Sequence, residues 1–85
     1  MEGKVAQIIT LIGELAEDTT IPKNIRKAVT EAKEKLAEEK EDLKVRSSTA
    51  VYLLDSVSED INMPMHARTQ IWTILSELES LREEE

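Results

Sequence analysis

Cysteine and phenylalanine are absent from this chain of 85 residues, and glycine and proline occur only twice each. Without cysteine there can be no disulfide framework and no thiolate metal site, so stability must come from packing, helix caps and ion pairs. The scarcity of glycine, proline and aromatic residues favours packed helices over a sheet sandwich. The composition and length therefore predict an all-α protein that forms one domain, residues 1–85.

Long apolar runs and an excess of positive charge are missing as well. No stretch approaches the roughly 20 apolar residues that a membrane span needs, and the first residues lack the pattern of a signal peptide. Eleven lysine and arginine residues against 18 acidic residues leave a net charge of −7, which repels phosphate backbones. We therefore expect a soluble, cytoplasmic protein that binds neither a membrane nor nucleic acid directly.

Apolar residues recur at helical spacing in four segments. The pattern predicts a first helix over about residues 3–17 and a second over about 22–43, with the charged run EEKEDLK as the solvated end of the second. The sequence RSST then interrupts the pattern, which makes Ser47 or Ser48 the expected N-cap of a third helix whose inner stripe reaches Ile61. A fourth helix is expected to begin at Pro64.

A motif of ten residues occurs twice in the chain. EDTTIPKNIR runs from Glu17 to Arg26, and EDINMPMHAR follows 42 residues later, from Glu59 to Arg68. The two copies share the skeleton E-D-x-x-x-P-x-x-x-R, and apolar positions outside the motif match at the same offset. The repeat predicts a duplicated helical hairpin, with hairpins over about residues 3–43 and 46–83, and hence an up-and-down four-helix bundle.

Each copy of the motif is expected to form a corner between two helices. Proline fits the first turn of a helix without penalty, and the residue before it is pushed into an extended conformation. The acidic pair at one helix end and the arginine in the next first turn are both disfavoured by their own helix dipoles, so we predict that they pair with each other. Recognition of a partner and a site for chemistry remain open alternatives. The residues of the predicted clasps are Glu17, Asp18, Pro22, Arg26, Glu59, Asp60, Pro64 and Arg68.

The duplicated motif, the length, the acidic balance and the cysteine-free helical pattern resemble the small archaeal proteins of uncharacterised protein family zero-one-four-seven. The resemblance covers essentially the whole chain. It implies an up-and-down four-helix bundle and an archaeal, cytoplasmic origin. The family has no assigned activity, so the resemblance brings no catalytic or binding residues to this sequence.

Up-and-down topology brings both corners to the same end of the bundle, together with the only histidine, His66. A metal-dependent or ligand-binding activity at this end is the alternative function. Di-iron bundles, however, use Glu-x-x-His pairs, and Met63 stands three residues before His66. No phosphate loop, nucleophile elbow or paired-histidine motif is present. We therefore expect no enzyme activity, no cofactor, no catalytic residue and no metal ligand.

The two aromatic residues lie away from the centres of the apolar stripes. Tyr52 falls on the outer side of the third helix, and Trp72 falls at the edge of the fourth helix's stripe. One reading is that Trp72 covers the rim of its own core and Tyr52 is an ordinary surface residue. The other is an interface, because exposed aromatic residues commonly anchor interfaces. We expect a small interaction or assembly module that binds a protein partner or itself, with a homodimer favoured.

Overall fold

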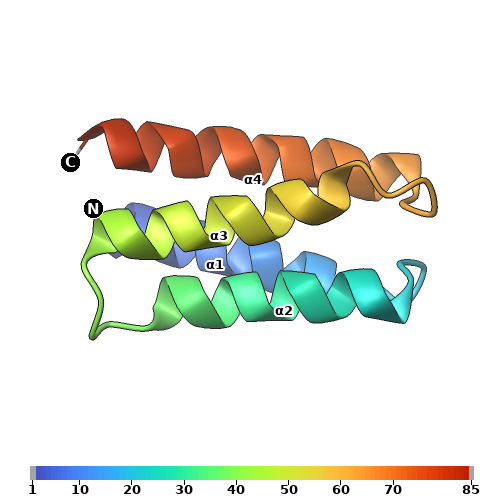
Figure 1. The fold of residues 1–85 in the computed structure, drawn as a ribbon, viewed down its shortest axis with the longest axis horizontal. Helices are drawn as coiled ribbons and strands as arrows, with labels where there is room; N and C mark the ends of the chain where they lie inside the picture. The colour runs from blue at the N-terminus through green and yellow to red at the C-terminus, as the bar shows by residue number, and fades with distance from the viewer. Residues whose placement is uncertain (1, 85) are drawn as a thin grey trace.

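The structure, a computed structural model, describes residues 2–84 of the chain and the side chains of residues 3–81. It contains the α-helices α1 (Glu2–Ala16), α2 (Lys23–Ala37), α3 (Leu43–Ser58) and α4 (Met65–Glu84), with no strand within residues 2–84 (Figure 1). The predicted all-α, up-and-down four-helix bundle is confirmed. Residues 1 and 85 of the predicted domain lie outside the described residues.

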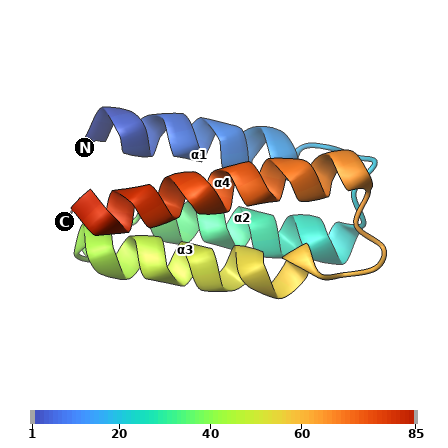
Figure 2. The same cartoon turned by 90° about the horizontal axis from the view of Figure 1, so that it is seen from above.

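The four helices form a ring in which each helix packs on the next one along the chain, and α4 closes the ring against α1. α1 and α3 are diagonal to each other, as are α2 and α4. The bundle measures 34 × 20 × 19 Å. Both proline corners lie at one end, whereas the α2–α3 loop, the start of α1 and the end of α4 lie at the other (Figures 1 and 2).

One apolar core fills the ring. Successive buried residues of α1 are three or four positions apart, which places them on one face of the helix. Full burial of one such side chain stabilises the fold by about 1.5–3 kcal/mol relative to exposure. The buried apolar residues are Val5, Ile8, Ile12, Leu15, Ile21, Ile25, Val29, Ala32, Leu36, Leu43, Ala50, Leu54, Met63, Ala67, Ile71, Ile74, Leu78 and Leu81.

The two halves of the chain match each other in structure as well as in sequence. α1 ends at Ala16 and α3 at Ser58, 42 residues later, and α2 and α4 begin at the same offset, at Lys23 and Met65. Four backbone hydrogen bonds of the first corner recur at the same offset in the second: those donated by Asp18, Ile21, Ile25 and Arg26 match those donated by Asp60, Met63, Ala67 and Arg68. The duplicated hairpin predicted from the repeat is therefore present in the fold.

The boundary between the second and third helices differs from the prediction. α2 ends at Ala37, and residues 38–42 form a loop, so the first five residues of the charged run are a connection and its last two begin α3. α3 begins at Leu43 with Asp42 as its N-cap. Ser47 and Ser48, the two predicted candidates for the N-cap, both lie inside α3, where Ser47 is buried and Ser48 is exposed. Glutamate and lysine are good helix formers, so the composition of this loop hid the break.

The end of the third helix differs as well. α3 stops at Ser58, and Ile61, predicted to lie on its inner stripe, is 91% exposed in the corner. Met63 is the buried apolar residue of this corner. Its counterpart in the first corner is Ile21, which is buried in the same way. The corner thus turns one apolar side chain into the core and leaves Ile61 on the surface.

Candidate functional site: the corner end and the outer face of α4

The first corner is held by the side chain of Asp18. Its Oδ1 accepts hydrogen bonds from Thr20 N, at 2.9 Å, and from Thr20 Oγ1, at 2.6 Å. Ile21 N donates to the Asp18 carbonyl at 3.1 Å, and Arg26 N donates to the Pro22 carbonyl at 3.0 Å. An aspartate that accepts from the backbone two residues ahead forms a turn of its own, so Asp18 sets the path of the chain into α2.

The second corner repeats this geometry. Asp60 Oδ1 accepts from Asn62 N at 2.8 Å, and Met63 N donates to the Asp60 carbonyl at 3.0 Å. Arg68 N donates to the Pro64 carbonyl at 3.0 Å, as Arg26 does to Pro22 in the first corner. The aspartate and the proline of the motif therefore have an architectural role in both copies.

The predicted ion pairs between acids and arginines are not formed. Arg26 Nε donates to the Ile21 carbonyl at 3.0 Å, and Arg68 Nη2 donates to the Asp60 carbonyl at 2.9 Å. Both carbonyls belong to the corner backbone, so the arginines bind the turn itself. The aspartate carboxylates are occupied by loop N–H groups instead. Glu17 and Glu59 are exposed and make no ion pair with either arginine.

His66 connects the two hairpins at this end. Its Nε2 lies 2.8 Å from Asp18 Oδ2 and 3.3 Å from Thr20 Oγ1. A carboxylate can only accept, so Nε2 carries the hydrogen and donates to Asp18. The hydroxyl of Thr20, then His66, then the N–H of Thr20 lower the pKa of Asp18 from 3.8 to about 2. The bond ties the α1–α2 corner to the first turn of α4.

An aspartate, a histidine and a threonine in contact suggest a nucleophilic triad, but this geometry cannot work as one. A triad needs one ring nitrogen on the acid and the other, unprotonated, on the hydroxyl. Here the same protonated nitrogen faces both groups, and the Thr20 hydroxyl points its hydrogen at Asp18. Within the described residues, no three histidine or acidic side chains are grouped as a metal site would require. The arrangement supports a structural role.

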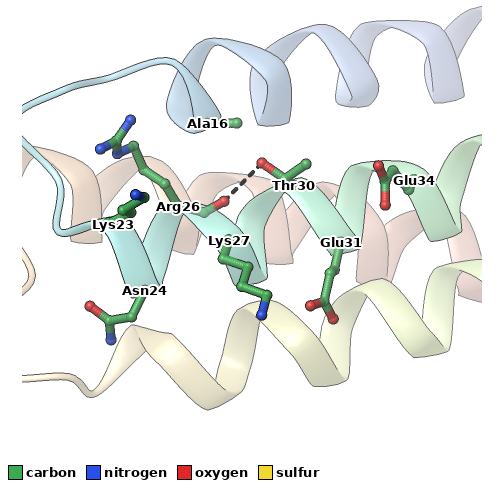
Figure 3. Close-up of a pocket in the computed structure, with 8 residues that line it drawn as sticks. All are labelled: Ala16, Lys23, Asn24, Arg26, Lys27, Thr30, Glu31 and Glu34. Atoms are coloured by element: carbon green, nitrogen blue, oxygen red, sulfur yellow. Dashed lines mark hydrogen bonds between the residues drawn. The ribbon is translucent and has the colours of Figure 1, made fainter.

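A hollow with a volume of about 850 Å³ lies along α2 near the first corner. Figure 3 shows that its side chains point in different directions: Arg26 reaches back toward the corner, whereas Lys27 and Glu31 point away from α1. The hollow is therefore an open stretch of helix surface, with cations at one end and acids at the other. Its lining residues are Ala16, Lys23, Asn24, Arg26, Lys27, Thr30, Glu31 and Glu34.

The outer face of α4 carries two of the large apolar side chains that the core does not use; the others are Leu11, Val45, Tyr52 and Ile61. Trp72 is 55% exposed and Met65 is 69% exposed. Met65 and Trp72 are seven residues apart and so lie on the same side of the helix, two turns from each other. Tyr52 is 74% exposed, but it lies on α3 between the exposed polar residues Ser48 and Asp55. Sequence reasoning selected Trp72 and Tyr52 and missed Met65.

Charge is distributed unequally between the two equivalent helix starts. Residues 61–76 contain one residue with a permanent charge, Arg68. The matching stretch of the first half, residues 19–34, contains six. Both stretches have the same fold and bury the same positions, so the fold does not require this difference. The lack of charge over residues 61–76 therefore needs another explanation.

Comparison with known proteins places the chain in a family. The model of an uncharacterised protein family, UPF0147, matches residues 1–81. The chain belongs to UPF0147. A UPF0147 protein of Methanocaldococcus jannaschii is 49% identical over 88% of this chain and 81% of its own length. A UPF0147 protein of Thermococcus kodakarensis is 42% identical over 96% of this chain and its entire own length.

Two crystal structures share the fold of this UPF0147 chain. A UPF0147 protein from Thermoplasma acidophilum superposes with a TM-score of 0.89 at 40% identity, and 94% of each chain is covered. MMP1188, a protein of unknown function, superposes with a TM-score of 0.87 at 53% identity, over 91% of this chain and 88% of its own. Among the described residues of the present protein, no helix is both long and apolar enough to cross a membrane.

Proposed function

We propose that this UPF0147 protein is a small, non-enzymatic interaction module of the cytoplasm, and that it binds protein through the outer face of α4. The observation that carries the proposal is the contrast between the two equivalent helices. In a protein with 34% charged residues, one face combines exposed apolar side chains with an almost complete lack of charge. We call this face the α4 stripe, and it consists of Met65, Thr69, Trp72 and Ser76.

Met65 and Trp72 are residue types that interface cores favour, and the α4 stripe lacks the charged residues that such cores exclude. Interface cores are depleted in lysine, glutamate and aspartate and enriched in tryptophan, tyrosine, phenylalanine, methionine and arginine. Tryptophan is also among the residues that most often dominate binding energy. Full burial of a large apolar side chain is worth about 1.5–3 kcal/mol relative to exposure. Trp72 and Met65 are 55% and 69% exposed, so a partner that covers them would recover part of this free energy.

A protein partner suits this surface better than nucleic acid. Nucleic-acid binding relies on lysine and arginine residues that contact phosphates, and the α4 stripe contains neither. The net charge of −7 adds a general repulsion of phosphate. The corner end supports the same reading, because Asp18, His66 and both corner arginines are engaged in holding the turns.

Photo-crosslinking at matched positions tests the proposal. A photoreactive amino acid replaces Thr69 in the stripe or, as control, Lys27, its structural counterpart on α2; both residues are exposed. After irradiation of whole cells we expect crosslinks to protein from position 69 and few from position 27. Equal crosslinking from both positions, or none from position 69, would contradict a binding role for the α4 stripe.

A further inference from the structure

The α4 stripe alternates large and small side chains. Met65, Thr69, Trp72 and Ser76 are spaced by four, three and four residues, so they fall on one narrow line along the helix. All are exposed. At 1.5 Å per residue, the line is about 16 Å long. Its order is large, small, large, small.

In the reversed order, small and large side chains change places, so a second copy of the stripe in the opposite direction is complementary to the first. If a second stripe lies antiparallel to the first, with a two-fold axis between Gln70 and Ile71, each large side chain meets a small one. Trp72 then lies at the height of Thr69 of the other copy, and Met65 at the height of Ser76. Ridges of one helix packing into hollows of another is the usual basis of helix association.

We infer that the partner of the α4 stripe is a second copy of this chain, bound antiparallel about that axis. The inference rests on the proposed function, because it names the occupant of the same surface. A two-fold contact of this kind is closed, so it yields a dimer and no longer assembly. Antiparallel helices also place opposite ends of their dipoles together.

The α4 stripe offers two copies a place to meet in spite of their like charge. Each copy carries a net charge of −7, so two copies repel each other wherever their charged faces meet. The α4 stripe is a face on which two copies can touch without bringing like charges together. Thr69 Oγ1 donates to Met65 O at 3.1 Å, so its hydroxyl hydrogen needs no water and the residue can present its methyl group.

The size of the stripe sets the strength expected of the dimer. A contact built on about 16 Å of one helix is smaller than the 1,200–2,000 Å² of standard stable interfaces, even with flanking contributions from neighbouring helices. We therefore expect a dissociation constant of about tens to hundreds of micromolar. Screening of the repulsion should tighten it as salt is raised.

Sedimentation equilibrium of the purified chain gives the first test. The parent is expected to dimerise, and Trp72→Ala to raise the dissociation constant about tenfold or more, as loss of a central aromatic does. Tyr52→Ala is the matched control, because it removes the other exposed aromatic residue and should change the constant less than about twofold. Circular dichroism melts establish that the variants are folded.

A residue exchange tests the register itself. Trp72→Thr alone should weaken the dimer, because threonine then opposes threonine. Adding Thr69→Trp to it restores a large side chain against a small one across the same axis, so the double variant should recover most of the parent affinity. The single Thr69→Trp variant should also weaken the dimer, because two indoles then oppose each other.

The outcomes separate this inference from the proposed function. A parent that stays monomeric at high micromolar concentration, or a dimer that Trp72→Ala leaves intact, overturns the self-pairing. If position 69 still crosslinks to a different protein in cells, the α4 stripe remains a binding surface and only its occupant was wrong. A dimer that the exchange does not restore overturns the antiparallel register.

Discussion

Asp18 makes three connections with one side chain. One carboxylate oxygen accepts from the backbone and the hydroxyl of Thr20, and the other accepts from His66 on α4. The first two bonds fix the turn between α1 and α2, and the third holds that turn against the other hairpin. The carboxylate must be ionised to accept all three, which is why these bonds lower its pKa to about 2.

Removing the hydroxyl of Thr20 should raise the pKa of Asp18. We expect Thr20→Val to move it from about 2 toward 3.8, because the side-chain bond from Thr20 is the largest cause of the shift. An NMR titration of the side-chain carboxyl carbon measures it. Thr19→Val is the control, since Thr19 is exposed and makes no bond to Asp18. An unchanged pKa in Thr20→Val would show that the hydroxyl does not stabilise the carboxylate.

The same shift fixes the pH range in which Asp18 supports the fold. The folded pKa lies below the usual value of 3.8, so the charged form is favoured by folding. Its contribution is therefore fully present above about pH 4 and is lost as the pH falls through about 2. In the Thr20→Val variant this acid loss of stability should be smaller.

The sequence located the corner residues correctly but not their bonds. Charge and helix-dipole arguments predicted that Arg26 would bind Glu17 or Asp18, since side-chain charges are what a sequence displays. The competing acceptors were backbone carbonyls, Ile21 O and Asp60 O, whose positions exist only once the turn has formed. His66 was placed at the correct end by topology, but its bond to Asp18 depends on how the hairpins face each other.

The helix α2 ends on a buried arginine from the next helix. Arg46 is only 6% exposed, and its Nε and Nη2 both donate to the Leu36 carbonyl, at 2.8 and 2.6 Å. Leu36 lies in the last turn of α2, where carbonyls lack partners within the helix. A cation at this end also suits the helix dipole. Arg46 thereby fixes the α2–α3 connection, which contains neither glycine nor proline.

Truncation of Arg46 should destabilise the bundle. We expect Arg46→Ala to lower the free energy of unfolding by about 1–3 kcal/mol, because a buried carbonyl loses its charged donor. The stability of Arg46→Lys should lie between that of the parent and that of Arg46→Ala, since lysine keeps the charge but cannot donate from two fixed nitrogens. Urea denaturation measures both. Lys44→Ala, an exposed change in the same helix, should stay within about 0.5 kcal/mol of the parent, and an equal loss there would contradict the role of Arg46.

Helix positions could be predicted from periodicity wherever a clear breaker was present. The proline corners gave the end of α1 and the start of α4 to within a residue. The α2–α3 boundary failed because residues 38–41 are all glutamate or lysine, and Leu43 fits the stripe of either helix. The repeat held the missing signal: moving the predicted start of the first helix by 42 residues gives a start near residue 45. Of the two large side chains of the α4 stripe, only Trp72 was predicted from the sequence, because Met65 resembles a core residue.

Viewed as a unit, the bundle is two equivalent hairpins arranged around one core. The duplication maps α1 on α3 and α2 on α4, so the contact between α4 and α1 corresponds to that between α2 and α3. The chain joins α2 to α3 through residues 38–42 and leaves α4 unjoined to α1. The end of α4 and the start of α1 nevertheless lie at the same end of the bundle as that loop (Figure 2).

This equivalence predicts that the chain tolerates circular permutation. Opening it between Lys40 and Glu41, and joining the end of α4 to α1 through a Gly/Ser linker of about ten residues, exchanges the two connections. Packed neighbouring helices lie about 8–10 Å apart, which such a linker spans easily. Exchanging one surface loop for another of similar length changes the closure entropy little, so stability should stay within about 2 kcal/mol of the parent.

Circular dichroism and urea denaturation of the permuted chain measure the result, with helical content and a single cooperative transition expected as in the parent. A chain opened between Leu53 and Leu54 is the control, since this cut lies inside α3 beside a fully buried leucine and should abolish cooperative unfolding. If the loop permutant were equally disrupted, residues 38–42 would be needed as a continuous connection. The fold would then require the original order of the helices along the chain, and the two connections would not be interchangeable.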